Sequence, residues 1–336
     1  MMQEKGHAAC KPEAISYLPI PVASLRADTI TNFNLYLPSH DGRAPVLYRD
    51  GAFPITTALL ERLRSSKVET LLVKSTDEEH YRHYLESNLG SLVADENLPM
   101  EERSALLYDS ARNLVRDVLR DPRAGNVLQR SEEVVSHMIR FLFADKQAFY
   151  HLIQVTSYDY YTYTHSVNVF VFNIALAARL GVREENLLDF GQGGLLHDIG
   201  KSRISPEILN KPGKLSPDEW RIIKMHPVFG DQMLLEQGCT SEISIDVVRH
   251  HHEKLCGGGC PDGLPGDDVS AWVRICTISD IFDALTTHRP YKKALDSYHS
   301  LLLMQEEMSN ELDPDFFHAF VELMGRVERP RPPKKT

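Results

Sequence analysis

The feature that most constrains the fold is a series of histidine and aspartate residues spread over apolar segments with helical spacing. His165 precedes one such segment, and His197 and Asp198 end another. The series continues with His226, His250-His251-His252-Glu253 and Asp280. Helical bundles build dinuclear metal centres in this way, because several helices each contribute one or two ligands to a central site. The pattern therefore predicts an all-α bundle around a metal centre.

The residue types explain how such a centre would be held. Two divalent cations close together repel each other, so they need an anion between them, and Asp198 beside His197 is placed to supply it. Two such metals lower the pKa of a bridging water and clamp a phosphoryl group. Histidines with a few carboxylates suit iron, manganese, zinc or cobalt, and the ligand set does not choose among them. The alternative for an isolated His-Asp pair is a polar pair in the core.

Several short motifs over about residues 145–325 carry a resemblance to a known family. They are His197-Asp198-Ile199-Gly200-Lys201 (HDIGK), His226-Pro227 (HP), His251-His252-Glu253 (HHE), the segment 280–286 (ADxxDALT) and Arg289-Pro290-Tyr291-Lys292 (RPY with a basic residue). In this order the chain resembles the HD superfamily of metal-dependent phosphohydrolases and, more narrowly, the HD-GYP family. The resemblance covers more than half of the chain and strengthens the prediction of a dinuclear site.

The resemblance implies a role for each matching residue. One metal would be held by His165, His197 and Asp280, the other by His226, His251 and His252, with Asp198 as the bridge. Lys201 would act with Asp198 in catalysis and contact a substrate phosphate. Arg289 and Lys292 would hold the phosphates or guanines of cyclic di-GMP, the family's usual substrate, although a solvated helix end is the alternative for both. Tyr161 stands where some trinuclear members have Glu, so two metals are expected, iron first and manganese or zinc as alternatives.

The loop that gives the family its name departs from the family pattern. Gly259 and Pro261 of the Gly-Tyr-Pro motif are present, but Cys260 replaces the tyrosine and Cys256 replaces the aspartate that usually opens the motif. With every implied metal ligand kept, the enzyme would still work, would work slowly or stop at the linear dinucleotide, or would bind nucleotide without turnover. The loss could also change partner contacts alone. A redox or metal role for the two cysteines is a further alternative to inert thiols, although no second pair completes a zinc site.

Spacing patterns predict two folded parts joined by helices. A small α/β domain is expected over 15–92, with strands near 33–37, 46–48 and 70–73 and helices near 59–63 and 78–89. Linker helices follow over 93–144, an HD-type bundle fills 145–326, and 1–14 and 327–336 are expected to be flexible tails. Gly181, Gly238 and Gly325 stand where helix C-caps belong. The small domain would be sensory or dimerising, or a structural cap.

Composition excludes several classes of protein. The 37 Lys and Arg against 47 Asp and Glu give a formal charge of −10, whereas general nucleic-acid binding needs a basic face. The segment Val167–Leu180 is shorter than the roughly 18 apolar residues of a membrane helix and contains polar residues, so no membrane insertion is expected. An odd number of cysteines, 5 in 336 residues, and the absence of an apolar signal-peptide region indicate the reducing cytoplasm.

The leading prediction is a cytoplasmic signalling enzyme of bacterial type that hydrolyses cyclic di-GMP by means of a water bridging two metals. The alternatives are a catalytically weak or inactive cyclic-dinucleotide sensor, and an HD phosphohydrolase of another cyclic nucleotide. The expected partners are a cyclic dinucleotide and signalling proteins such as GGDEF proteins, with a homodimer as a candidate assembly.

Overall fold

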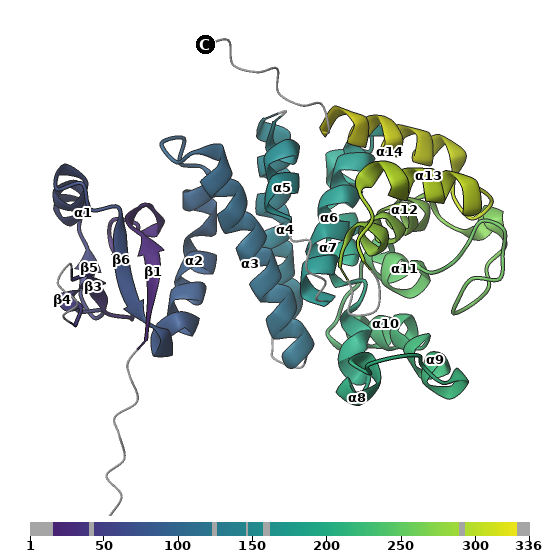
Figure 1. The fold of residues 1–336 in the computed structure, drawn as a ribbon, viewed down its shortest axis with the longest axis horizontal. Coiled ribbons are helices and arrows are strands. Elements are labelled where there is room, and N and C mark those ends of the chain that lie inside the picture. Colours follow the sequence, from purple (N-terminus) through teal and green to yellow (C-terminus); the bar gives the residue numbers. More distant parts are fainter. Residues whose placement is uncertain are drawn as a thin grey trace, which may run out of the picture. The chain divides into compact units, whose positions relative to one another are not determined.

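The computed structural model describes residues 16–39, 44–122, 126–145, 147–156, 162–288 and 293–327. Contacts within the chain define two compact units, residues 1–88 and 89–336, and each is described by itself. The strands belong to the first unit and the long run of helices to the second, as the purple and the teal-to-yellow parts of Figure 1 show. The predicted fold class, a small α/β part followed by an all-α bundle, is confirmed.

The N-terminal unit is built on an antiparallel sheet with the strand order β1-β6-β3-β4. The strands are β1 (Tyr17–Pro21), β3 (Leu35–Leu37), β4 (Val46–Arg49) and β6 (Thr70–Lys74). Leu71 and Val73 of β6 are buried and alternate with more exposed residues, which is the period of a sheet with one face in the core. A second ladder pairs β2 (Thr29–Ile30) with β5 (Pro54–Ile55).

Short helices complete this unit. Helix α1 (Thr57–Ser65) begins where the side chain of Thr56 accepts a hydrogen bond from the backbone N–H of Leu59, at 3.2 Å. Its buried leucines are the ones that the helical spacing predicted. The remaining elements are the 3-10 turns η1 (Val22–Ser24) and η2 (Ser75–Asp77) and helix α2 (Glu78–Val93), which contains the division between the units.

The regular elements that the structure describes in the second unit are helices, joined by loops. Its α-helices are α3 (Met100–Arg120), α4 (Val127–Ala144), α5 (Ala148–Val155), α6 (Thr162–Arg179), α7 (Glu184–Leu196), α8 (Pro206–Leu209), α9 (Pro217–Ile223), α10 (His226–Glu236), α11 (Glu242–His250), α12 (Ala271–Thr286), α13 (Ser297–Glu307) and α14 (Pro314–Val327). Two 3-10 turns, η3 (Ile199–Arg203) and η4 (Gly266–Asp268), lie between them. Helices α3 and α4, which fall in the expected linker, contribute Leu107, Leu114 and Met138 to the core of this unit.

Helix α6 is central to the bundle. It is buried on nearly every side, because it packs against α3, α7, α12 and α14. This explains the apolar run after His165, since a helix that is hydrophobic all round belongs inside a protein or a membrane. Across the described parts of the chain, no helix is long and apolar enough to cross a membrane.

Two glycines allow the helices around the site to approach closely. A Cβ atom on Gly193 would lie 2.9 Å from the Cα atom of Ser244, so α7 and α11 pack backbone against backbone. A Cβ atom on Gly200 would lie 1.9 Å from the carbonyl oxygen of His226. Turn η3 therefore meets the start of α10, which places Asp198 beside His226.

One expected helix cap is wrong. Gly181 and Gly238 have left-handed φ angles of 77° and 83° after α6 and α10, as caps do, but Gly325 lies inside α14. Glycine costs a helix only about 1 kcal/mol relative to alanine. The packing of Phe320 and Met324 in the core outweighs that cost, so the helix continues.

Candidate metal centre

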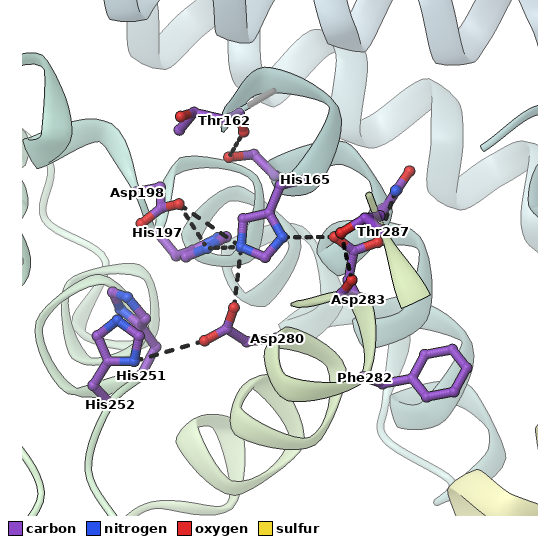
Figure 2. Close-up of polar contacts among 12 residues, drawn as sticks. Thr162, His165, His197, Asp198, His251, His252, Asp280, Phe282, Asp283 and Thr287 are labelled. Carbon is purple, nitrogen blue, oxygen red and sulfur yellow. Dashed lines mark hydrogen bonds and ion pairs between the residues drawn. The ribbon is translucent and has the colours of Figure 1, made fainter. Parts of the chain in front are cut away.

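The side chains that we predicted to bind metal come together in one region of the bundle, and Figure 2 labels all of them except His226. They come from the first turn of α6 (His165), the end of α7 (His197, Asp198), the start of α10 (His226), the end of α11 (His251, His252) and the middle of α12 (Asp280). All of them are buried except His252, whose side chain is 38% exposed. The centre is therefore closed on most sides and open beside His252.

One group consists of His165, His197 and Asp280. The Nε2 atom of His165 lies 3.0 Å from a carboxylate oxygen of Asp280 and 3.3 Å from Nε2 of His197. The second group consists of His226, His251 and His252, in which the Nε2 atoms of His226 and His251 are 3.2 Å apart. Within each group the ligand atoms lie within 4.8 Å of one another. These are the two sets that the family resemblance assigned to separate metals.

Asp198 lies between the two groups. Its Oδ1 atom is 3.2 Å from Nε2 of His226, and its Oδ2 atom is 3.5 Å from Nε2 of His197 and 3.8 Å from Nε2 of His165. Each carboxylate oxygen thus faces one group, which is the arrangement of a bridging ligand. The Nζ atom of Lys201 contacts Oδ2 at 2.5 Å.

Backbone carbonyls determine which nitrogen of each imidazole carries the proton. A carbonyl can only accept, so the Nδ1 atoms of His197, His226 and His251 donate to the carbonyls of Gly194 (2.8 Å), Ile223 (2.7 Å) and Val248 (3.0 Å). Their Nε2 atoms consequently present lone pairs to the centre. Facing lone pairs repel unless a cation lies between them, so this donor set fits divalent metal ions.

The protonation states support the same assignment. Burial lowers the pKa of His197 and His251, so these imidazoles are neutral near pH 7. Burial opposes ionisation of Asp198 and Asp280, but the charge of Lys201 and the contact with His165 respectively hold their pKa values well below the usual range. Neutral imidazoles and ionised carboxylates are the forms that bind metal.

A buried chain of hydrogen bonds orients His165, and the sequence analysis assigned none of its members a role. The Nδ1 atom of His165 donates to Oδ2 of Asp283 at 2.7 Å (Figure 2), and Oδ1 of Asp283 accepts from the side-chain amide of Asn168 at 2.7 Å. The hydroxyl of Tyr108 donates to Asn168 at 2.8 Å. The signal was present in the segment 280–286, where Asp283 follows Asp280 by one helical turn.

The variant loop after α11 is held by a buried carboxylate. Glu253 is 1% exposed and accepts hydrogen bonds from the backbone N–H groups of Asp262 (2.7 Å), Gly263 (2.9 Å) and Leu264 (3.1 Å). The backbone of the loop at Gly259 also packs closely against the backbone of Glu253, since a Cβ atom on Gly259 would lie 2.5 Å from Cα of Glu253. In this loop Cys256 is exposed, and Cys260 before Pro261 is partly buried.

One histidine of the run lies outside the predicted metal centre. His250, the extra histidine of the run, contacts Asp246 at 2.6 Å and Asp262 at 3.0 Å, outside the groups that could hold a metal. Arg249 contacts Asp262 as well, so both residues tie the loop to α11. The predicted substrate residues Arg289 and Lys292, and Tyr161, lie outside the described residues.

Comparison with known proteins places the chain in a family. A family model described as an HD domain matches residues 149–316. The chain belongs to the HD domain family. The membership that the motifs predicted is confirmed. The fold of this HD domain protein is that of Bd1817, a HDG"Y"P protein from Bdellovibrio bacteriovorus, with a TM-score of 0.64 and 22% identity over 92% of this chain and 100% of that chain.

Curated relatives of this HD domain protein are named as phosphodiesterases. Cyclic di-GMP phosphodiesterase PA4108 of Pseudomonas aeruginosa is 36% identical over 224 residues, which are 66% of this chain and 54% of that protein. The 3'3'-cGAMP-specific phosphodiesterase 3 of Vibrio cholerae is 38% identical over 159 residues, which are 47% of this chain and 34% of that protein. The matched regions therefore span about half of the first relative and about a third of the second.

Proposed function

We propose that this protein is a metal-dependent phosphodiesterase that hydrolyses cyclic di-GMP or a related cyclic dinucleotide. The observation that carries the proposal is the convergence of two histidine-rich groups on the two oxygens of Asp198. The names of the curated relatives support the substrate class.

Each predicted ligand has a place in this proposal. His165, His197 and Asp280 would hold one divalent ion, His226, His251 and His252 the other, and Asp198 would bind both. Two divalent ions held there would lower the pKa of a bridging water and polarise the phosphoryl group that it attacks. Iron is the first expectation for the metal, and manganese and zinc are the alternatives.

The remaining residues orient the ligands and the substrate. Asp283 would hold His165 in one ring orientation with the proton on Nδ1. Lys201 is 17% exposed and contacts Asp198, so it would steady the bridging carboxylate and offer positive charge to a substrate phosphate. Arg289 and Lys292 would hold the phosphates or guanines of cyclic di-GMP.

A second candidate function is a sensor that binds cyclic dinucleotide without cleaving it. The variant loop favours this alternative, because Cys256 and Cys260 stand where the family has a carboxylate and a phenol. Neither cysteine belongs to a group that could hold a metal in the described residues, so the substitution leaves the predicted ligand set complete. For this reason we favour the enzyme.

Product analysis separates the two functions. The full chain would be loaded anaerobically with Fe(II) or Mn(II) and given cyclic di-GMP, and the linear dinucleotide and GMP would be followed by chromatography. The matched control is Asp198→Ala. We expect product with the parent protein and none with the variant. Metal-loaded parent protein that binds cyclic di-GMP without forming product would favour the sensor.

A further inference from the structure

A pocket of about 190 Å³ opens beside the metal centre. The predicted metal ligands His252 and Asp280 line it. Lys254 and the turn between α13 and α14, which contributes Met308 and Glu311, line it as well. A substrate whose phosphate lies at the metal centre would extend its adjacent nucleoside into this space.

Apart from the predicted metal ligands and Thr277, whose hydroxyl contacts backbone carbonyls, the polar side chains that a ligand meets in the pocket are Lys254 and Glu311. Glu253 also lines it, but its carboxylate oxygens already accept three backbone hydrogen bonds from the variant loop. The Nζ atom of Lys254 contacts Oε1 of Glu311 at 2.6 Å, and the two side chains are 41% and 24% exposed. A partly exposed pair of this kind contributes little to stability, so its stabilising value does not explain its place beside the metal centre.

The backbone holds Glu311 in position. Its N–H donates to the carbonyl of Met308 at 2.9 Å, and its own carbonyl accepts from the N–H of Leu255 at 3.3 Å. Two residues later, Asp313 forms an ion pair with Arg274 of α12 at 3.3 Å. The carboxylate is therefore presented by a turn that is anchored on two sides, which lowers the cost of ordering it when a ligand binds.

We propose that this pocket binds a guanine base and that Glu311 is the residue that selects it. The Watson–Crick edge of guanine has two neighbouring N–H donors beside a carbonyl acceptor. The carboxylate of Glu311 offers two acceptors and Lys254 offers a donor beside them, which is the complementary pattern. Met308 and Ile281 supply apolar contact for the faces of the ring.

Adenine does not fit this pattern. Its corresponding edge has one amino donor and one ring-nitrogen acceptor, so the ring-nitrogen lone pair would face a carboxylate oxygen. Sites built to hydrogen-bond a ligand reject an analogue that leaves their polar groups unpaired. The inference rests on the proposed function, because it names the base that the cyclic dinucleotide would carry.

Mononucleotide binding tests the pocket separately from catalysis. Calorimetry of the Mn(II)-loaded full chain would compare GMP, IMP and AMP, which share the phosphate and differ in the base edge. We expect GMP to bind at least about tenfold more tightly than AMP, with IMP between them, because IMP lacks the second donor. In Glu311→Gln the ratio of GMP to AMP affinity falls at least about tenfold, since an amide offers one donor and one acceptor and suits adenine.

The control is Glu307→Gln, which removes the same charge from an exposed position of α13 and keeps the parent ratio. An equal ratio in parent, Glu311→Gln and Glu307→Gln overturns the guanine pocket. If that preparation still cleaves cyclic di-GMP, the proposed function survives this failure. Conversely, a ratio that depends on Glu311 with no cleavage of any cyclic dinucleotide keeps the pocket and overturns the proposed enzyme.

Discussion

Among single residues, Asp283 contacts a predicted metal ligand, His165, without being one itself. Asp283→Asn keeps one acceptor for His165 but removes the negative charge and the acceptor that faces Asn168. We expect the affinity for Mn(II) to fall about 10- to 100-fold, as is usual when the partner of a ligating histidine is changed. Competition with a chromophoric chelator measures it. Asp315→Asn, exposed on α14, is the control, and an unchanged affinity in Asp283→Asn would contradict the assigned role.

The residues around His165 show which part of the site could be predicted from the sequence. His197, His226 and Asp280 lie in short motifs, and each motif marks its own residue, so the predicted ligands could be named before the fold was known. Asp283 reaches His165 across 118 residues of chain, and Asn168 reaches Asp283 across 115. Such pairs form only when α6 packs against α12, and no local pattern records that packing.

At the scale of elements, two substitutions of glycine by alanine are expected to have opposite effects on stability. Gly193 lies where α7 and α11 pack closely, whereas Gly325 of α14 has open space around it. Gly193→Ala places a methyl group 2.9 Å from the backbone of Ser244 and is expected to destabilise the fold by about 1–3 kcal/mol. At Gly325 a Cβ atom meets nothing within 4 Å, so Gly325→Ala is expected to stabilise α14 by about 0.5–1 kcal/mol. Urea unfolding measures the free energy of unfolding of both variants. Equal changes in the two would contradict the close packing of α7 against α11.

The loop after α11 is a second element whose anchoring can be tested. Burial raises the pKa of the Cys260 thiol, and the charge of Glu253 acts in the same direction despite Lys224. Because the thiolate is the reactive form, alkylation of Cys260 by iodoacetamide is slow at pH 8 and quickens as the pH rises. Glu253→Ala frees the loop and removes the charge, so both changes lower this pKa and speed the reaction at pH 8.

Two other cysteines serve as internal standards for that measurement. Cys256 is exposed, so its alkylation rate is expected to stay the same in the parent protein and in Glu253→Ala. Cys276 is buried in α12, and burial raises the pKa of its thiol strongly, so it stays unmodified while the protein is folded. Mass spectrometry of peptides distinguishes the three sites. An equal rate for Cys260 in both proteins would show that Glu253 does not hold the loop.

Element length explains only some of the elements that the sequence missed, because β1 was missed although it has 5 residues, two of them prolines that interrupt its pattern. Strand β6 and helix α1 were predicted because each covers a full repeat of its apolar pattern. Strands β2 and β5 have 2 residues each and helix α8 has 4, which is too short for any periodicity to develop. These short pieces become regular through the tertiary contacts around them, as β2 and β5 do by pairing with each other.

For the whole molecule, we expect the predicted metal centre and the stability of the helical unit to be coupled. Its predicted ligands come from α6, α7, α10, α11 and α12, so metal ions would bind the folded bundle and have no equivalent site in the unfolded chain. An ion present at 100 times its dissociation constant stabilises the folded state by about 2.7 kcal/mol. Chelation is therefore expected to lower the Tm of this unit by roughly 5–10 °C.

Calorimetry with and without a chelator measures this shift, and Asp198→Ala separates it from general effects of the reagent. Asp198 contacts both groups and is the predicted bridging ligand, so the Tm of the variant is expected to be insensitive to the chelator. The N-terminal sheet unit contributes none of the predicted ligands, and its unfolding is expected to stay the same in every sample. A parent protein whose Tm does not change on chelation, after loading with Mn(II) or Fe(II), would contradict a metal centre built by these helices.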